Sequence, residues 1–273
     1  MNYSMVVSDW DDTLTPIGDT IPQRTKAALD RIRAEGVTMA IVSGRSPHGI
    51  HVQLRRNEID DAGLYMIAYN GGLAAQAWDD EPLFSHQLDR DLAVRAARVC
   101  AEAGAAVMVH SGRQLLTDRL DNYGVQFEAE SNDFEAVLVP DFENLDFTPV
   151  KLLVGGEKQQ LTELCERLRT QFAGQAEVML SADFLLEFTA KGVDKGNALR
   201  GLCKAIDIPI EQVVAFGDNH NDIPMLRAAG HSVAVANAVP QAREIADEIV
   251  GPCTECGVAD GLDELFPTAF RRG

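Results

Sequence analysis

Two apolar runs that flank one amphipathic stretch limit the possible folds of this chain more than any other feature of its sequence. The run Met5-Val6-Val7 is followed by a helical pattern over 23–35, which begins after Pro22 and ends at Gly36, and then by the apolar segment "VTMAIVSGR". A strand, a helix and a second strand in this order predict a βαβ unit with parallel strands and a right-handed crossover. We therefore expect an α/β fold with a doubly wound parallel sheet.

A middle segment interrupts this alternation. Between about residues 84 and 188 the chain contains short strand-like pieces, a helical pattern over 89–103 and an acidic, poorly periodic stretch over 121–147, a mixture typical of an α+β unit. From Lys191 onward, strands and helices alternate again. A length of 273 residues suits a core with an inserted domain. We predict a discontinuous core at 1–83 and 189–273 and an insert at 84–188.

The negative net charge argues against nucleic acid and anionic membranes as partners. The chain has 24 Lys and Arg against 42 Asp and Glu, a formal charge of −18, which repels nucleic acid and anionic membranes. A site for a small anion must then be locally positive. No apolar run approaches the roughly 18 residues of a membrane-spanning helix, and the first residues do not resemble an export signal, so we expect a cytoplasmic protein. A monomer and a homodimer are both compatible with the sequence.

The five cysteines do not predict a disulfide framework, because their number is odd and the chain shows no export signal. Cys253 and Cys256 form a CxxC, which allows a zinc or redox interpretation. Neither a second CxxC nor a histidine pair lies near it, so a small turn in "GPCTECG" is the favoured interpretation.

Polar side chains stand where the predicted parallel strands end. Asp9 and Asp11 follow the first strand, Ser43 the second and Asn70 the third, and Asp218 follows the strand "VVAF". In an open α/β sheet the carboxyl ends of the strands meet along one edge, where ligands bind. We expect these residues, which are far apart in the sequence, to lie together at that edge.

The acidic stretch "DWDDT" at 9–13 allows three interpretations. A calcium loop fails, because it needs Gly and Glu where this chain has Leu14 and Thr20. A solvated turn is compatible with the stretch alone. The third interpretation is a Mg²⁺ site. It is favoured by a second acidic cluster, formed by Asp218 and Asp222. Helix capping explains Asp222 but not Asp218. Two acidic clusters at one edge of a sheet supply the oxygen ligands that Mg²⁺ needs.

Four segments together resemble the ordered motifs of the haloacid dehalogenase superfamily: "DWDDTLT", "VSGR", "VDKGNAL" and "FGDNHNDIPML". They resemble most the Cof-type phosphatases, to which "YNGG" and "AVANAVPQAREIAD" are also similar, so the resemblance covers nearly the whole chain. It implies a Rossmann-like core with an α/β cap as the insert. It also implies a Mg²⁺-dependent phosphatase that hydrolyses a small phosphorylated metabolite through an aspartyl-phosphate, with specificity determined by the cap.

The resemblance implies a role for each acidic residue of the motifs. Asp9 is the expected nucleophile and metal ligand. Asp11 is the expected general acid and base, with its backbone carbonyl on the metal. Asp218 is expected as a further carboxylate ligand, with Asp222 in or just outside the first coordination shell.

Other motif residues are expected to bind the phosphoryl group. Lys195 would pair with Asp9 and the transferring group, and Ser43 would donate hydrogen bonds to phosphate oxygens, so both are expected to be catalytic. The full set of predicted substrate contacts is Thr13, Ser43, Gly44, Arg45, Asn70, Lys195 and Asn221.

Two residues depart from the pattern of the family. Asp12 stands where Cof-type relatives usually have Gly and receives no role, and Trp10 is bulkier than the usual aliphatic residue and is expected in the core. Two other functions stay open. One is a phosphomutase of the phosphomannomutase type, whose first motif is also similar. The other is a non-catalytic phosphate-ligand binding protein on the same fold.

Overall fold

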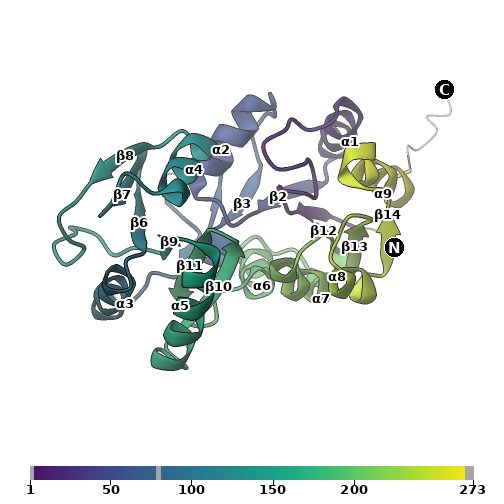
Figure 1. The fold of residues 1–273 in the computed structure, drawn as a ribbon. Helices are drawn as coiled ribbons and strands as arrows, with labels where there is room; N and C mark the ends of the chain where they lie inside the picture. The colour runs from purple at the N-terminus through teal and green to yellow at the C-terminus, as the bar shows by residue number, and fades with distance from the viewer. Residues whose placement is uncertain (1–2, 78–80, 268–273) are drawn as a thin grey trace, which may run out of the picture. The chain divides into compact units, whose positions relative to one another are not determined.

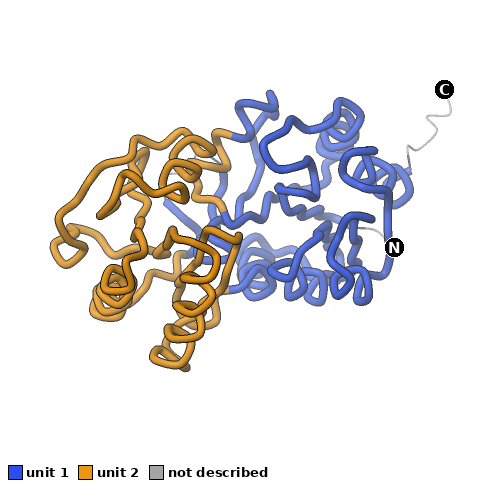
Figure 2. Tube along the Cα trace, viewed as in Figure 1, with its two compact units in different colours: residues 1–44, 53–84, 194–273 blue, residues 45–52, 85–193 orange. Residues whose placement is uncertain are grey.

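The structure is a computed structural model that describes residues 3–77 and 81–267. The chain divides into two compact units (Figure 2): unit 1 contains 1–44, 53–84 and 194–273, and unit 2 contains 45–52 and 85–193. Within the core predicted at 1–83 and 189–273, residues 45–52 and 189–193 group with unit 2. Residues 1–2, 78–80 and 268–273 of the predicted core lie outside the described residues.

Unit 1 is built on an eight-stranded sheet in the order β14-β13-β12-β1-β2-β3-β4-β5. All neighbouring strands from β14 to β3 pair in parallel, and β4 is antiparallel to β3. This confirms the predicted α/β class. The strands are β1 (Met5–Ser8), β2 (Thr38–Val42), β3 (Tyr65–Ala68), β4 (Leu73–Gln76), β5 (Phe84–Ser85), β12 (Val213–Gly217), β13 (His231–Val235) and β14 (Glu248–Val250).

Helices lie on both sides of this sheet, as in a doubly wound fold. In Figure 1, α1 and α9 lie on one side, and α6, α7 and α8 on the other. Helix α1 buries the positions that its sequence pattern indicates, Ala28, Leu29 and Ile32. The helices are α1 (Gln23–Ala34), α6 (Lys195–Ala205), α7 (Ile223–Ala228), α8 (Pro240–Ile245) and α9 (Gly257–Leu265), together with α2 (Pro47–Arg56), which is shared by the two units.

Unit 2 contains a six-stranded sheet in the order β10-β11-β9-β6-β7-β8, in which only β7 and β8 pair in parallel. Two apolar clusters stabilise it: a larger one that joins the sheet to α3 and α5, and a smaller one under α4. Its elements are β6 (Ala106–Ser111), β7 (Gln114–Thr117), β8 (Glu135–Leu138), β9 (Lys151–Gly155), β10 (Ala176–Ala182), β11 (Leu185–Ala190), α3 (Arg90–Glu102), α4 (Tyr123–Asn132) and α5 (Lys158–Gln171).

Helix α4 lies in the acidic stretch that the sequence pattern left without a clear element. Two of its four buried residues, Glu128 and Asn132, are polar, so an apolar period does not mark the helix. Glu128 is paired with His110 at 2.9 Å. The local signal is the cap, because the Asn122 side chain accepts hydrogen bonds from the Gly124 and Val125 amides at 2.8 and 3.4 Å.

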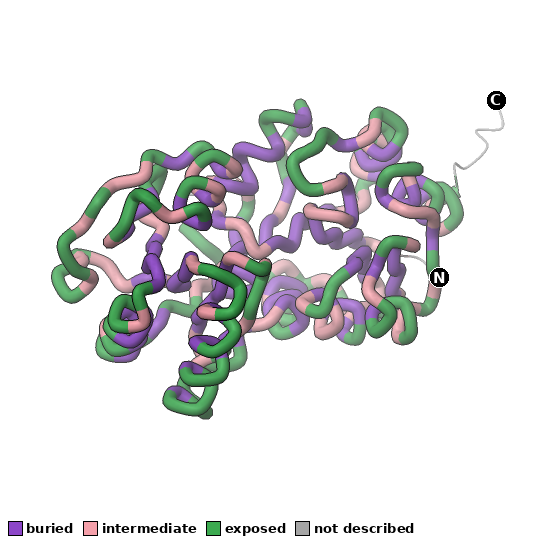
Figure 3. The backbone as a smooth tube through the Cα atoms, viewed as in Figure 1, coloured by how far each residue is buried: buried purple, intermediate pink, exposed green. Residues whose placement is uncertain are grey.

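Burial follows this architecture (Figure 3). Every residue of β1 and β12 is buried, as expected for central strands of a parallel sheet that helices cover on both faces. Trp10 is only 1% exposed, so it packs in the core as predicted. In the described ranges, no helix has both the length and the apolar character that crossing a membrane requires.

Candidate active site

The pairing of β1 with β12 brings the two acidic loops together. Ser8, the last residue of β1, lies opposite Phe216 of β12, and the Asp9 amide donates to the Phe216 carbonyl at 3.0 Å. Asp9 and Asp218 therefore leave the sheet at the same edge, although 209 positions separate them in the sequence (218 − 9). Both side chains are buried, with residue exposures of 7% and 6%. The strand-end argument thus places this pair correctly.

Lys195 joins the two loops from the first residue of α6. Its Nζ lies 2.6 Å from Asp9 Oδ1 and 2.6 Å from Asp222 Oδ1, and its side chain is completely buried. The helix begins here because the Asp194 side chain accepts a hydrogen bond from the Asn197 amide at 2.8 Å and caps it. A buried lysine needs such carboxylate partners, because an unpaired buried charge is costly.

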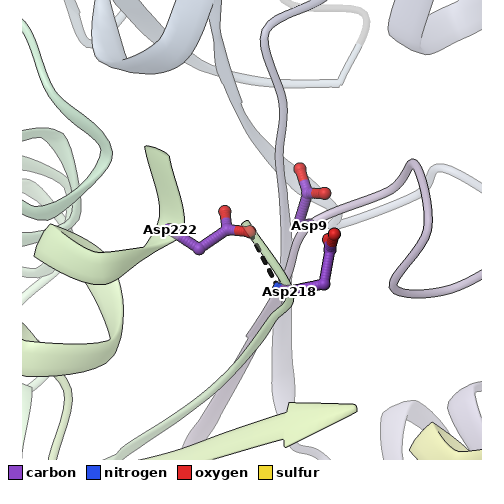
Figure 4. A group of neighbouring side chains, drawn as sticks. All are labelled: Asp9, Asp218 and Asp222. Atoms are coloured by element: carbon purple, nitrogen blue, oxygen red, sulfur yellow. Dashed lines mark hydrogen bonds between the residues drawn. The ribbon is translucent and has the colours of Figure 1, made fainter. Parts of the chain in front are cut away.

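The carboxylates gather at the carboxyl ends of β1 and β12 (Figure 4). Asp9, Asp218 and Asp222 each offer an oxygen, and these three oxygens lie within 4.8 Å of one another. No other group of three or more metal-binding side chains was found among the described residues, and the Cys253-Cys256 pair is not part of one. All five cysteines are free thiols in this structure.

Each oxygen of Asp222 has a partner. Its Oδ1 accepts from Lys195 at 2.6 Å, and its Oδ2 accepts from the amides of Asp218 and Asn219, both at 2.9 Å. Asp222 therefore orders the loop that carries Asp218. In addition, the Thr13 hydroxyl donates to Asp218 Oδ1 at 2.7 Å, so the two acidic loops are also bonded directly.

The charges in this cluster do not balance. Burial is the largest influence on Asp9 and raises its pKa well above the ordinary value; Lys195 opposes this, while Asp222 and the other acids add to it. Burial and Asp222 raise the pKa of Asp218 to about 7. Burial alone would lower the pKa of Lys195, but the two carboxylates outweigh burial and raise it. If all three carboxylates were ionised, they and the one ammonium would carry a net charge of −2, which a divalent cation would balance.

A second set of polar groups lies at the ends of β2 and β3. Ser43 is 1% exposed, and its carbonyl accepts from the Asn70 amide at 2.9 Å. The Asn70 side chain lies against Gly44, where a Cβ would be 3.0 Å from Nδ2, and it accepts from Asn221 Nδ2 at 3.0 Å. The structure thus joins the Ser43 loop to the loop after β12 through two asparagine side chains.

The backbone around Asn70 is strained. Tyr69 and Asn70 both have φ of 56°, and Gly71 has φ of 110°, so three successive residues have positive φ. A Cβ on Gly71 would lie 2.4 Å from the Asp194 carbonyl oxygen. Such strain at a strand end is typical of functional sites, where the surrounding structure holds it in place.

Asp11 and Arg45 are not members of the group of three buried carboxylates. Asp11 is half-buried, is not one of the three clustered carboxylates, and pairs with Thr15 through a backbone bridge. Arg45 belongs to unit 2, where its Nη1 donates to Asn132 Oδ1 at 2.7 Å. The catalytic and substrate-binding roles expected for the site residues, including these two, stay predictions.

One contact of the site was not foreseen from the sequence. The Val239 amide donates to the Asp218 carbonyl at 2.8 Å, so the turn between β13 and α8 also supports the Asp218 loop. Because the donor is a backbone amide, the type of side chain at this position does not predict the contact. The available sequence signal is Pro240 at the start of α8, which marks where that turn ends.

Comparisons with known proteins agree with this architecture. The family model described as haloacid dehalogenase-like hydrolase matches residues 6–262. A Haemophilus influenzae protein, provisionally named a phosphatase, is 29% identical over 268 residues, which cover 98% of this chain and 100% of that protein. The "HMP-PP phosphatase" of Yersinia pseudotuberculosis is 29% identical over 265 residues, 95% of this chain and 94% of that protein.

A solved structure is also similar over almost its full length. The crystal structure of a haloacid dehalogenase-like hydrolase from Bacteroides thetaiotaomicron has a TM-score of 0.90 and 27% sequence identity, covering 97% of this chain and 100% of that one. Together with the matched family model, it shows that the chain belongs to the haloacid dehalogenase-like hydrolase family.

Proposed function

We propose that this protein is a Mg²⁺-dependent phosphatase that hydrolyses a small phosphorylated metabolite through an aspartyl-phosphate on Asp9. The family, the phosphatase names of the two relatives and the acidic cluster support this function. The observation that carries it is Lys195, which is completely buried and lies 2.6 Å from both Asp9 and Asp222. A carboxylate nucleophile held beside an ammonium is prepared to receive an anionic phosphoryl group.

The two acidic loops would hold the metal. Asp9 and Asp218 would be carboxylate ligands and the Asp11 carbonyl a further one, while Asp222, whose two oxygens already accept hydrogen bonds, would orient the Asp218 loop. When bound, Mg²⁺ would balance the net charge of the cluster and offset the negative charge of the phosphoryl oxygens.

The reaction then proceeds in two displacements. A carboxylate oxygen of Asp9 attacks phosphorus and forms an O–P bond, while the bond between phosphorus and the leaving oxygen breaks and Asp11 gives that oxygen a proton. Water next attacks the phosphorus of the aspartyl-phosphate. Asp11 takes a proton from this water, the bond between phosphorus and the Asp9 oxygen breaks, and inorganic phosphate and free Asp9 are released. Lys195 and Ser43 hold the phosphoryl oxygens throughout.

The other predicted contacts complete the proposal. Gly44 and Asn70 would shape the phosphate loop, with Asn221 supporting Asn70, and Thr13 would act mainly through Asp218. Arg45 would contact the substrate. The insert predicted at 84–188 would act as the cap that selects the leaving group, and the enzyme is expected to work in the cytoplasm.

Phosphate release tests this function. We expect the purified protein to release phosphate from an aryl phosphate and from a panel of sugar phosphates, phosphoglycolate and cofactor phosphates, with Mg²⁺ present. Asp9→Asn and Asp218→Ala should each lower kcat by at least about 10³-fold, since one removes the nucleophile and the other a metal ligand. Asp91→Asn, an exposed position in α3, is the control and should leave kcat unchanged.

Three outcomes would contradict the proposal. Substantial activity of Asp9→Asn would exclude Asp9 as the nucleophile. Isomerisation of a sugar phosphate without phosphate release, dependent on a bisphosphate activator, would indicate a phosphomutase. Binding of phosphorylated ligands without any turnover would indicate a non-catalytic binding protein.

A further inference from the structure

Asp12 and the Cys253 turn are two sequence features that the proposed mechanism does not use, and one side chain contacts both. Asn237 Nδ2 donates to the Asp12 carbonyl oxygen at 2.7 Å. The Cys253 amide donates to Asn237 Oδ1 at 2.9 Å. Asn237 lies in the turn after β13, and these two hydrogen bonds hold its amide group in one orientation even though the residue is exposed.

The peptide unit that Asn237 holds has an uncommon conformation. Asp12 has φ of 61°, in the left-handed region, where most residues other than Gly are strained and Asp or Asn are best tolerated. Its amide donates to the Thr15 carbonyl at 2.7 Å, and its Oδ1 accepts from the Ile17 amide at 3.3 Å. The carboxyl group of Asp12 therefore serves the turn that carries it.

The turn that contains Asn237 also reaches the second acidic loop. Two residues after Asn237, the Val239 amide donates to the Asp218 carbonyl at 2.8 Å. A short segment, 237–239, therefore bonds to the backbone of the Asp9 loop and to the backbone of the Asp218 loop. The separation between the two loops depends in part on this segment.

We propose that Asn237 is a positioning residue, which holds the carbonyl of residue 12 and thereby keeps Asp9 and Asp11 aimed at the metal and the phosphoryl group. This inference rests on the proposed function. The hydrogen bond from Asn237 fixes the peptide one residue beyond Asp11, so its loss lets the loop depart from the reactive geometry. Small displacements of catalytic groups reduce rates far more than they reduce substrate binding.

Two substitutions separate the two contacts of Asn237. Asn237→Ala removes both. Asn237→Asp keeps an oxygen that can accept from the Cys253 amide but has no donor for the Asp12 carbonyl. Asn144→Ala is the matched control, because Asn144 is an exposed asparagine of unit 2 whose Nδ2 donates to Asp141 at 3.2 Å. Each variant is compared with the wild type at a temperature well below its melting temperature, so that all are folded.

We expect kcat for an aryl phosphate to fall about 10-fold in Asn237→Ala and at least as much in Asn237→Asp, with KM changed less than about 2-fold. Mg²⁺ binding, measured by calorimetry without substrate, should weaken about 3-fold, because the loop that offers Asp9 is less ordered. Asn144→Ala should match the wild type in all three quantities.

The outcomes distinguish this inference from the proposed function. If the wild type neither releases phosphate nor binds Mg²⁺, the proposed function fails and the positioning role fails with it. If the wild type does both, and Asn237→Ala retains its kcat and Mg²⁺ affinity, only the positioning role is wrong. Full activity of Asn237→Asp would also overturn it, because the contact with Cys253 would then be the one that matters.

Discussion

Replacing Lys195 by Met removes the only cation that contacts two buried carboxylates of the described site. Met has a similar length and no charge, so the change leaves Asp9 and Asp222 without an ammonium partner and creates little empty space. The two ion pairs have N–O distances of 2.6 Å, and the three side chains are between 0% and 9% exposed. Breaking a buried pair by removing one partner typically costs about 3–5 kcal/mol.

The expected cost lies near the lower end of that range. The pKa of Asp9 is already raised, so Asp9 can take up a proton when Lys195 is absent, and this limits the loss. A loss of about 3 kcal/mol corresponds to a fall in melting temperature of about 6–12 °C in a protein of this size. In addition, Mg²⁺ should raise the melting temperature of Lys195→Met more than that of the wild type, because the cation compensates the unpaired carboxylates.

Thermal unfolding followed by circular dichroism, with a chelator and with Mg²⁺, measures both effects. Lys26→Met is the matched control, since Lys26 forms one ion pair with Asp30 at 2.9 Å on the surface of α1, with side-chain exposures of 24% and 46%. Exposed pairs of this kind contribute about 0.5 kcal/mol or less. If Lys195→Met melts within the range of Lys26→Met in the presence of chelator, the ammonium does not stabilise the buried carboxylates and the reasoning is refuted.

Three other perturbations examine unit 2, the strained turn and the metal. Burial alone would raise the pKa of Glu128, but the hydrogen bond with His110 and the charges of His110, Lys151 and Arg45 together outweigh burial and lower it. The ionised form of Glu128 therefore stabilises the fold above the ordinary pKa of 4.5, and this contribution disappears as the pH falls through the folded-state pKa. Glu128→Gln should therefore lower the free energy of unfolding by about 1.5–3 kcal/mol at neutral pH, and urea titrations should show the difference shrinking below pH 4.5; a difference independent of pH would contradict this. Gly71→Ala should cost about 2 kcal/mol more than Gly36→Ala, because both glycines have positive φ but only at Gly71 would the new Cβ meet a backbone atom, the Asp194 carbonyl oxygen. Equal losses in urea unfolding would show that the turn relaxes. Finally, Mg²⁺ should raise the melting temperature of the wild type progressively with its concentration, and Asp218→Asn should lose most of this rise; an equal rise in both proteins would place the cation elsewhere.

The sheet and its acidic edge could be predicted because they follow from local rules. The periodicity of α1 and the apolar strands determine a parallel sheet, and the carboxyl ends of such strands meet at one edge. Asp9 and Asp218 therefore lie together, as expected. The pairing of Lys195 with Asp9 was anticipated only through the family resemblance, since an isolated lysine is usually exposed.

The elements that were missed depend on interactions between distant residues. Helix α4 buries Glu128 and Asn132, polar residues of types that are mostly exposed, and the burial of Glu128 depends on its partner His110 in β6. The support that Val239 and Asn237 give to the acidic loops consists of bonds to backbone carbonyls, which leave no pattern in the sequence.

The central place of β1 in the sheet has a consequence for how the protein is made. Asp9 leaves the ribosome 209 residues before Asp218 (218 − 9), a delay of about 10–40 s at ordinary rates of synthesis. During this interval β1 can pair with β2, but its other edge stays unpaired until β12 has been synthesised. The continuous segment 85–193 of unit 2 is synthesised within the same interval. A nascent chain therefore cannot form the complete acidic cluster until Asp218 and Asp222 have emerged, and before that point the edge of β1 that pairs with β12 is exposed to wrong pairing and aggregation.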